Sequence, residues 1–200
     1  FNIVGKYGAP VQTLLKKAAT LDIQMICPLH GPILKDNLGY YIDKYNTWSS
    51  YQPEDKGVLV ACASIHGNTK AAAEKMVEIL KSKGAAKVAF TDLSRDDMAE
   101  AIEDAFRYDK LVLAAASYDA GVFPPMEDFL NRLSHKAFQN RKVAIIENGS
   151  WAPTAARTMK SMLDGMKNLT VCENTVTILS TMKEKDVAAM EQLADELLCD

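Results

Sequence analysis

From Gly57 onward, short apolar runs alternate with longer amphipathic segments. The apolar runs cover residues 58–63, 86–90, 110–116, 142–146 and 171–179. Between them, apolar residues recur at three- and four-residue spacing, which predicts helices over 69–83, 96–106, 126–133, 154–166 and 185–198. Five strand–helix alternations predict an α/β fold with a parallel sheet. The continuously apolar runs are typical of central strands that are covered on both faces.

The first 56 residues follow a different pattern. We predict a short helix over 10–20, a short strand over 23–27 and an aromatic-rich helix over 40–51, with a polar linker at 52–56. So few elements cannot enclose a core of their own. This segment must therefore pack on the α/β part or on sequence outside the 200 residues.

Composition excludes several classes of protein. With 48% hydrophobic and 24% charged residues, the chain has the composition of a soluble globular protein of one or two domains. The 23 basic and 26 acidic residues are interspersed, so nucleic acid is not expected as a partner. No apolar run approaches the roughly 20 residues that span a bilayer, so no membrane association is expected. The four cysteines have no paired spacing, which favours free thiols and a cytoplasmic location.

One short segment between the first strand and the first helix has the features of an anion site. This first candidate loop consists of Ser64, Ile65, His66, Gly67, Asn68 and Thr69. The main-chain N–H groups at the start of a helix have no partner within the helix, and the two hydroxyl side chains can join them around an anion. The chain contains neither G-x-x-x-x-G-K-[ST] nor G-x-G-x-x-G. The loop therefore suits a single terminal phosphate, and the alternative is an ordinary N-cap turn without a ligand.

Two further candidate loops follow the third and fourth strands, at the sheet edge where open parallel sheets bind ligands. The second candidate loop consists of Ser117, Tyr118, Asp119, Ala120 and Gly121. The third consists of Asn148, Gly149, Ser150 and Trp151. Small residues let the backbone approach a flat ligand, and the two aromatic side chains could stack on it or could simply cover the core. Three such loops at one edge predict a planar phosphorylated cofactor.

These loops resemble those of known flavoproteins. Residues 64–69 resemble the S-x-x-G-N-T phosphate loop of flavodoxin-like domains, and the strand pattern resembles their doubly wound, five-stranded parallel sheet of order 2-1-3-4-5, which carries FMN. Residues 121–125 and 148–151 resemble the second and third flavin loops of the flavodiiron proteins. In that family a metallo-β-lactamase-like domain with two irons precedes the flavodoxin-like domain. Residues 26–33 resemble the end of that diiron domain, where the last histidine ligand lies in an H-G-P turn.

The resemblance implies a division of the chain into three parts. Residues 1–39 would be the end of the metallo-β-lactamase-like domain, 40–56 a connecting helix and linker, and 57–200 a flavodoxin-like FMN-binding domain. His30 would be a metal ligand only in the intact protein; the alternative is a histidine that caps a turn. One histidine cannot hold a diiron centre, which needs several nitrogen and oxygen ligands. We therefore expect the chain, which begins at Phe1, to be a C-terminal piece of a flavodiiron protein with no catalytic residue of its own.

The resemblance also implies a function. The first loop would hold the FMN phosphate, and the second and third loops would bracket the flavin ring. FMN would receive electrons from a rubredoxin-like or other donor protein and pass them to the diiron site of a head-to-tail homodimer, which would reduce dioxygen or nitric oxide. The alternative is a free-standing flavodoxin-like electron carrier without catalytic activity of its own.

Two residues depart from the family's pattern. His66 stands where the family commonly has an aromatic residue, so it could donate to the phosphate, flank the flavin or lie in solvent. Glu147 stands where a small residue is common. A buried carboxylate beside the flavin would disfavour the anionic reduced cofactor, but we expect the side chains of Glu147 and Asp119 to face solvent.

Overall fold

The computed structural model describes residues 1–199. Its strands are β1 (Asp55–Ala63), β2 (Val88–Asp92), β3 (Tyr108–Tyr118), β4 (Gly121–Val122), β5 (Lys142–Asn148) and β6 (Thr170–Ile178). Its helices are the short 3-10 helix η1 (Gly5–Tyr7) and α1 (Gly8–Ala18), α2 (Leu38–Ser49), α3 (Asn68–Ser82), α4 (Met98–Arg107), α5 (Pro124–His135), α6 (Ala155–Leu163) and α7 (Glu184–Leu198). Each strand and helix predicted after Gly57 is present, with ends shifted by a few residues.

The sheet has the strand order β2-β1-β3-β5-β6, and all neighbours on this path are parallel. The short strand β4 pairs antiparallel with the end of β3 and was not predicted. Apart from β4, the order is the predicted 2-1-3-4-5, so the flavodoxin-like fold is confirmed. After β1 the chain places β2 on one side of it, and then returns to place β3 on the other side. The position between β1 and β3 is therefore the switch point where such sheets bind ligands.

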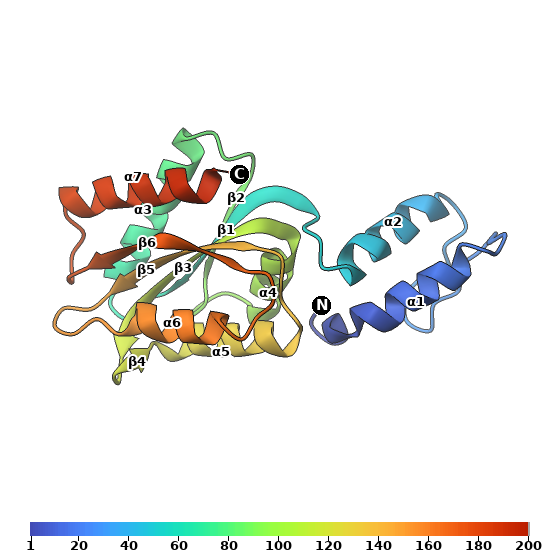
Figure 1. Ribbon diagram of the computed structural model, residues 1–200, viewed down its shortest axis with the longest axis horizontal. Helices are drawn as coiled ribbons and strands as arrows, with labels where there is room; N and C mark the ends of the chain where they lie inside the picture. Colours follow the sequence, from blue (N-terminus) through green and yellow to red (C-terminus); the bar gives the residue numbers. More distant parts are fainter. Residues whose placement is uncertain (200) are drawn as a thin grey trace.

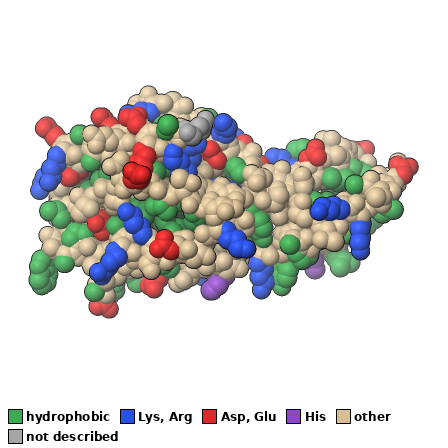
Figure 2. Space-filling model, in the orientation of Figure 1, with side chains coloured by type: hydrophobic (Ala, Val, Ile, Leu, Met, Phe, Trp, Pro, Cys, Tyr) green, Lys and Arg blue, Asp and Glu red, His purple; other side chains and the backbone are tan. Residues whose placement is uncertain are grey.

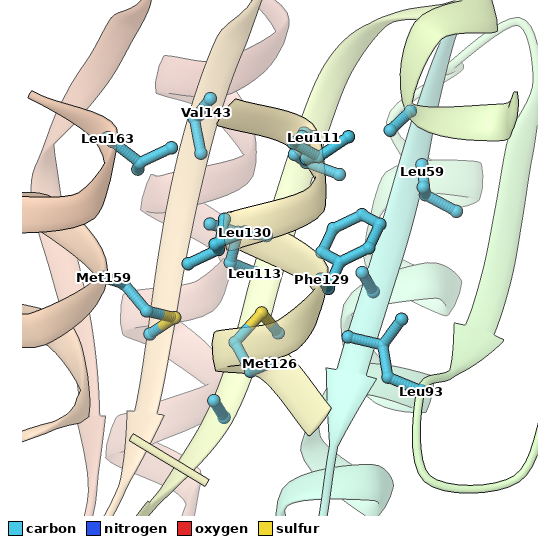
Figure 3. Close-up of a cluster of buried hydrophobic side chains, with 14 of the residues drawn as sticks. Leu59, Leu93, Leu111, Leu113, Met126, Phe129, Leu130, Val143, Met159 and Leu163 are labelled. Atoms are coloured by element: carbon cyan, nitrogen blue, oxygen red, sulfur yellow. The ribbon is translucent and has the colours of Figure 1, made fainter. Parts of the chain in front are cut away.

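Two layers of helices cover the sheet (Figure 1): α3 and α7 lie on one face, and α4, α5 and α6 lie on the other. The continuous apolar strands supply both cores because alternate residues point to opposite faces. Leu111 and Leu113 of β3 pack beneath Phe129 and Leu130 of α5 (Figure 3), whereas Val112 faces the α3 and α7 side. All five side chains have at most 1% of their surface exposed.

The N-terminal segment, residues 1–54, projects from the sheet as a pair of packed helices, α1 and α2 (Figure 1). Both helices were predicted. The strand predicted over 23–27 is wrong: only Ile26 forms a bridge, antiparallel to Leu34. A strand needs a neighbouring strand with which to exchange main-chain hydrogen bonds. In the described part of the N-terminal segment, residues 23–27 have only the bridge to Leu34, so they do not form a strand.

Several contacts fasten this segment to the α/β layers. The ring of Phe1 stacks on that of Phe106 with the centroids 4.0 Å apart. The Tyr51 hydroxyl donates to the Gly5 carbonyl at 2.8 Å. The buried Arg141 guanidinium donates to the carbonyl oxygens of Tyr51 and Phe106, at 2.8 and 2.5 Å. The segment thus has a defined attachment to α4 and to the start of β5.

Large apolar side chains are exposed mainly on this segment. Twelve are at least 40% exposed: Ile3, Val4, Tyr7, Leu14, Leu21, Met25, Leu29, Ile33, Tyr40, Tyr41, Tyr45 and Trp48. Elsewhere on the face shown in Figure 2, acidic and basic side chains are interspersed without a large area of one charge. Among residues 1–199, no helix has the length and apolar character that crossing a membrane requires.

Candidate functional site

The three candidate loops lie at one edge of the sheet, at the carboxyl ends of β1, β3 and β5. In Figure 1 the strand arrowheads point away from α1 and α2, so the loops lie at the end of the molecule opposite the N-terminal segment. The first and second loops flank the switch point between β1 and β3. The structure therefore brings together the residues that the sequence predicted as one site.

The first loop leaves the start of α3 open. Gly67 has a φ of +92°, which L side chains rarely adopt, and nothing lies within 4 Å of where its Cβ would be. Its N–H donates to the Ser64 hydroxyl oxygen at 3.0 Å. Ala71 is the first residue of the described helix whose N–H reaches a carbonyl, that of Gly67 at 2.9 Å. The N–H groups of residues 68–70 are thus available to an anion, as the helix geometry requires.

The side chains of the first loop differ in exposure. Thr69 is buried, with 2% of its surface exposed, and Asn68 is partly buried. Ile65 and His66 are exposed, so the structure places His66 at the solvent side of the loop. Lys70 follows directly and forms an ion pair with Asp92 at 3.2 Å. The hydrogen bond with Asp92 raises the pKa of Lys70, and the positive charge of Lys70 is paired with the Asp92 carboxylate.

The second loop is a tight hairpin between β3 and β4. Ser117 pairs with Val122 and Tyr118 with Gly121, which leaves Asp119 and Ala120 as the two turn residues. Their φ values of +47° and +57° are the left-handed pair that a type I′ turn requires. Asp119 is exposed, as expected. The sequence did not predict the hairpin because neither turn residue is glycine or asparagine.

The third loop is held at its beginning by the end of β6. Asn148, which is 6% exposed, donates its amide N–H to the Ser180 carbonyl at 2.8 Å and accepts the Ser180 N–H at 3.1 Å. The Gly149 N–H donates to the Ile178 carbonyl at 3.0 Å. Trp151 is 95% exposed, so it does not cover the core. Ser180 contributes to the site through these bonds, and no sequence pattern predicted it.

The second and third loops are joined to each other. The Ser117 hydroxyl oxygen accepts the N–H groups of Thr154 and Ala155, at 2.8 and 3.2 Å, and the Thr154 hydroxyl donates to the Gly121 carbonyl at 2.8 Å. A Cβ on Gly149 would lie 3.0 Å from the Ser117 hydroxyl oxygen. The Ser117 hydroxyl oxygen already accepts two hydrogen bonds from the protein. Contacts from these loops to a ligand would therefore be made mainly by main-chain groups and exposed side chains.

The expectation for Glu147 was wrong. Its side chain is buried, with 8% of the residue exposed, and does not face solvent. One carboxylate oxygen accepts the Ala156 N–H at 2.8 Å, and the other accepts the Thr177 hydroxyl at 2.8 Å. A carboxylate is stabilised at the amino end of a helix by the main-chain N–H groups and the helix dipole, and this explains the burial.

Cys62 lies at the end of β1, just before the first loop. Its side chain is fully buried, and burial raises the pKa of the thiol to about 12. A thiol that stays protonated at neutral pH is a poor nucleophile and a poor metal ligand. Cys62 is therefore part of the core.

His30 lies in an exposed turn closed by the bridge between Ile26 and Leu34. Gly31 in this turn has a φ of +123°. Within residues 1–199, no group of three or more His, Cys, Asp or Glu side chains could hold a metal ion. The structure thus shows the predicted turn but no metal site around it in the part described.

No protein-family model matches the chain. Among curated proteins it is similar to an uncharacterized protein of Methanocaldococcus jannaschii, with 24% identity over 188 residues that cover 92% of this chain and 46% of that protein. It is also similar to the anaerobic nitric oxide reductase flavorubredoxin of Aliivibrio fischeri, with 22% identity over 165 residues that cover 81% and 33% of the two chains. The chain spans less than half the length of these relatives.

Solved structures show the same relation. The rubredoxin oxygen:oxidoreductase of Desulfovibrio gigas matches 98% of this chain with 49% of its own, at a TM-score of 0.90 and 16% identity. A flavoprotein of Thermotoga maritima matches 98% with 49% of its own, at a TM-score of 0.83 and 24% identity. An archaeal flavodoxin matches 70% of this chain with 95% of its own, at a TM-score of 0.61 and 20% identity. The chain has a flavodoxin-like fold and matches about half the length of flavodiiron protein structures.

Proposed function

We propose that this chain is the FMN-binding, electron-transferring part of a flavodiiron oxidoreductase. The observation that carries the proposal is the open amino end of α3 at the switch point. There Gly67 adopts a left-handed conformation, and free N–H groups and the buried Thr69 surround space that a phosphate would fill. The residues present therefore fit the phosphate group of a flavin mononucleotide.

The first loop would hold the phosphate through Ser64, Gly67, Asn68 and Thr69. The flavin ring would lie between the second and third loops, beside the exposed rings of Tyr118 and Trp151. Main-chain groups of Asp119, Ala120, Gly121, Gly149 and Ser150 would bind its polar edge. Bound FMN supplies one- and two-electron transfer, while the protein supplies binding, orientation and electrostatics.

In the intact protein, residues 1–39 would complete a metallo-β-lactamase-like diiron domain, with His30 as one ligand, and residues 40–56 would connect it to the flavin domain. The likeness to the flavodiiron structures supports this division because it covers 98% of the chain and so includes the N-terminal segment. The donor would be a rubredoxin-like or other electron-transfer protein, and the electrons would reduce dioxygen or nitric oxide. We place the protein in the cytoplasm, in keeping with its free cysteines.

The arrangement of one chain also supports a head-to-tail homodimer. The three loops lie at the end of the sheet away from α1 and α2, and the His30 turn lies in the segment that joins those two helices (Figure 1). The nine residues of β1 alone span about 30 Å at the usual rise per residue. A second copy in reverse orientation would bring the flavin of one chain close to the metal site of the other.

A free-standing electron carrier is the second candidate. It is favoured by the archaeal flavodoxin, 95% of which the chain matches, but that likeness covers only 70% of this chain. A carrier has no use for the exposed apolar helix pair of the N-terminal segment. The intact mass of the protein in its native cells separates the two, because a carrier would have a mass near 22.0 kDa and a flavodiiron protein a mass about twice as large.

Titration of the purified chain with flavins tests the proposal directly. We expect FMN fluorescence to be quenched at micromolar protein, and riboflavin, which lacks the phosphate, to bind at least 100-fold more weakly, about 2.7 kcal/mol. Thr69→Val should weaken FMN but leave riboflavin unchanged. Thr91→Val, at a similarly buried threonine of β2 outside the loops, is the matched control. Equal affinity for FMN and riboflavin would overturn the phosphate assignment, and no binding of either would overturn the proposal.

A further inference from the structure

We propose that Glu147 is a positioning residue that holds the third loop in the conformation that binds flavin, and this inference rests on the proposed function. Its carboxylate links three elements. Glu147 is the residue before the last of β5, Ala156 lies in the first turn of α6, and Thr177 belongs to β6. The two carboxylate oxygens accept one hydrogen bond from each partner, both at 2.8 Å.

The chain enters and leaves the third loop through fixed points. On entry, Asn148 and Gly149 are bonded to Ser180 and Ile178 at the end of β6. On exit, the N–H groups of Thr154 and Ala155 are bonded to Ser117, and that of Ala156 to Glu147. Side chains of β3 and β5 thus accept the N–H groups of residues 154, 155 and 156 at the start of α6.

Between these fixed points the loop has no support of its own. Within the described part of the chain, residues 150–153 make no hydrogen bond to any other residue, and Trp151 is almost fully exposed. The path of the loop therefore depends on its two ends. Glu147 acts on the exit end and, as the residue before Asn148, also adjoins the entry end, so one side chain affects both.

The same bonds distinguish the two helix ends at this edge of the sheet. The amino end of α3 is open, whereas that of α6 already has an anion of the protein itself, the Glu147 carboxylate. At α6 the N–H groups of Thr154, Ala155 and Ala156 already donate to Ser117 and Glu147. The first loop is therefore left to the phosphate and the third loop to the ring.

Glutamine at this position separates hydrogen bonding from charge. In Glu147→Gln the amide oxygen can still accept the Ala156 N–H, and the amide N–H can donate to the Thr177 hydroxyl oxygen. In Glu147→Ala both partners lose their acceptor. Asp97→Ala is the matched control, since the Asp97 carboxylate accepts the Ala99 N–H at 2.7 Å at the start of α4. This helix follows β2, which β1 and β3 separate from β5 in the sheet.

Two measurements on the purified full chain test the inference. The first is hydrogen–deuterium exchange without flavin: we expect exchange in residues 149–155 to accelerate at least tenfold in Glu147→Ala and less than threefold in Glu147→Gln. The second is FMN affinity, which should fall at least tenfold in Glu147→Ala and return to within threefold in Glu147→Gln. Asp97→Ala should lower the melting temperature without changing either value.

The outcomes separate this inference from the proposed function. If wild type does not bind FMN, the proposed function fails, and the flavin role of Glu147 fails with it, whatever the exchange data show. If wild type binds FMN but Glu147→Ala binds it equally well, or exchanges equally slowly in residues 149–155, Glu147 only stabilises the fold and the inference is wrong. If Glu147→Gln is as impaired as Glu147→Ala, the charge and not the pair of hydrogen bonds is responsible, which also overturns it.

Discussion

The hydroxyl oxygen of Ser117 lies 2.8 Å from the main-chain nitrogen of Thr154, a residue 37 positions further along the chain. The Thr154 hydroxyl in turn reaches the Gly121 carbonyl at 2.8 Å. The second and third loops are therefore one unit, with Ser117 as the acceptor that caps α6. The conformation that one loop presents to a ligand therefore depends on the other loop as well.

Replacement of this acceptor should weaken both stability and flavin binding. In Ser117→Ala, the N–H groups of Thr154 and Ala155 lose their partner, and loss of a helix cap costs about 1 kcal/mol. We expect the free energy of unfolding in urea to fall by that amount and FMN to bind more weakly. Ser134→Ala, at an exposed serine of α5, should change neither. Unchanged FMN affinity in Ser117→Ala would show that the two loops act independently.

Trp151 offers a test in which binding and stability separate. Its side chain is 95% exposed, and surface substitutions of this kind usually change stability by less than about 0.5 kcal/mol. Trp151→Ala should therefore melt at the wild-type temperature but bind FMN more weakly and quench its fluorescence less. For comparison, Trp48→Ala should lose stability and retain FMN, because the Trp48 indole N–H donates to Glu54 at 2.7 Å, far from the loops. Wild-type FMN affinity in Trp151→Ala would exclude the ring as a flavin contact.

Ala120 is held in a conformation that costs energy. An L residue in the left-handed region costs roughly 1–2 kcal/mol, whereas glycine at such a site loses only about 0.5–1 kcal/mol of additional backbone entropy. The balance favours glycine, so Ala120→Gly should raise the free energy of unfolding by up to about 1 kcal/mol. Ala115→Gly, in the extended strand β3, should lower it. A loss of stability in Ala120→Gly would show that the turn is not left-handed at this position.

The junction between α2 and β1 should respond to acid. The hydrogen bond from Lys44 is the largest cause that lowers the pKa of Glu54 from its ordinary value of 4.5, and burial opposes it. A carboxyl group whose pKa is lowered by folding stabilises the folded state above its unfolded pKa, and this contribution is lost as pH falls through the folded pKa. Stability should therefore decline below about pH 4.5.

Trp48 reports on this change, since its indole also donates to Glu54. Its fluorescence, measured in a Trp151→Phe background, should shift over the same acidic range. In Glu54→Gln the shift should disappear, and the decline of stability with acid should become shallower. A pH profile identical in Glu54→Gln and wild type would assign the decline to other carboxylates.

The sequence predicted the sheet and the position of the three loops at one of its edges well because both depend on local periodicity. Leu111, Val112 and Leu113 form a continuous apolar run, and this identified a central strand before its neighbours were known. The position of Gly67 between a strand and a helix likewise identified the open helix end. These signals lie within a few residues of one another, where spacing alone is informative.

What the sequence did not predict depends on contacts between distant residues. Glu147 was expected in solvent, but its carboxylate has partners 9 and 30 positions further along the chain, at residues 156 and 177. The strand expected over 23–27 had the right composition but lacks a neighbouring strand in the described chain. The hairpin at Asp119 and Ala120 lacked the glycine or asparagine that usually marks such a turn.

The buried Arg141 has a consequence for how related sequences can vary. It donates to the carbonyl oxygens of Tyr51, Phe106, Gln139 and Asn140, at 2.5 to 3.1 Å. A carboxylate partner would have to change together with the arginine, but every amino acid provides a carbonyl oxygen. At this contact, attachment of the N-terminal segment requires arginine at position 141. The side chains at positions 51, 106, 139 and 140 can vary, because only their carbonyl oxygens take part.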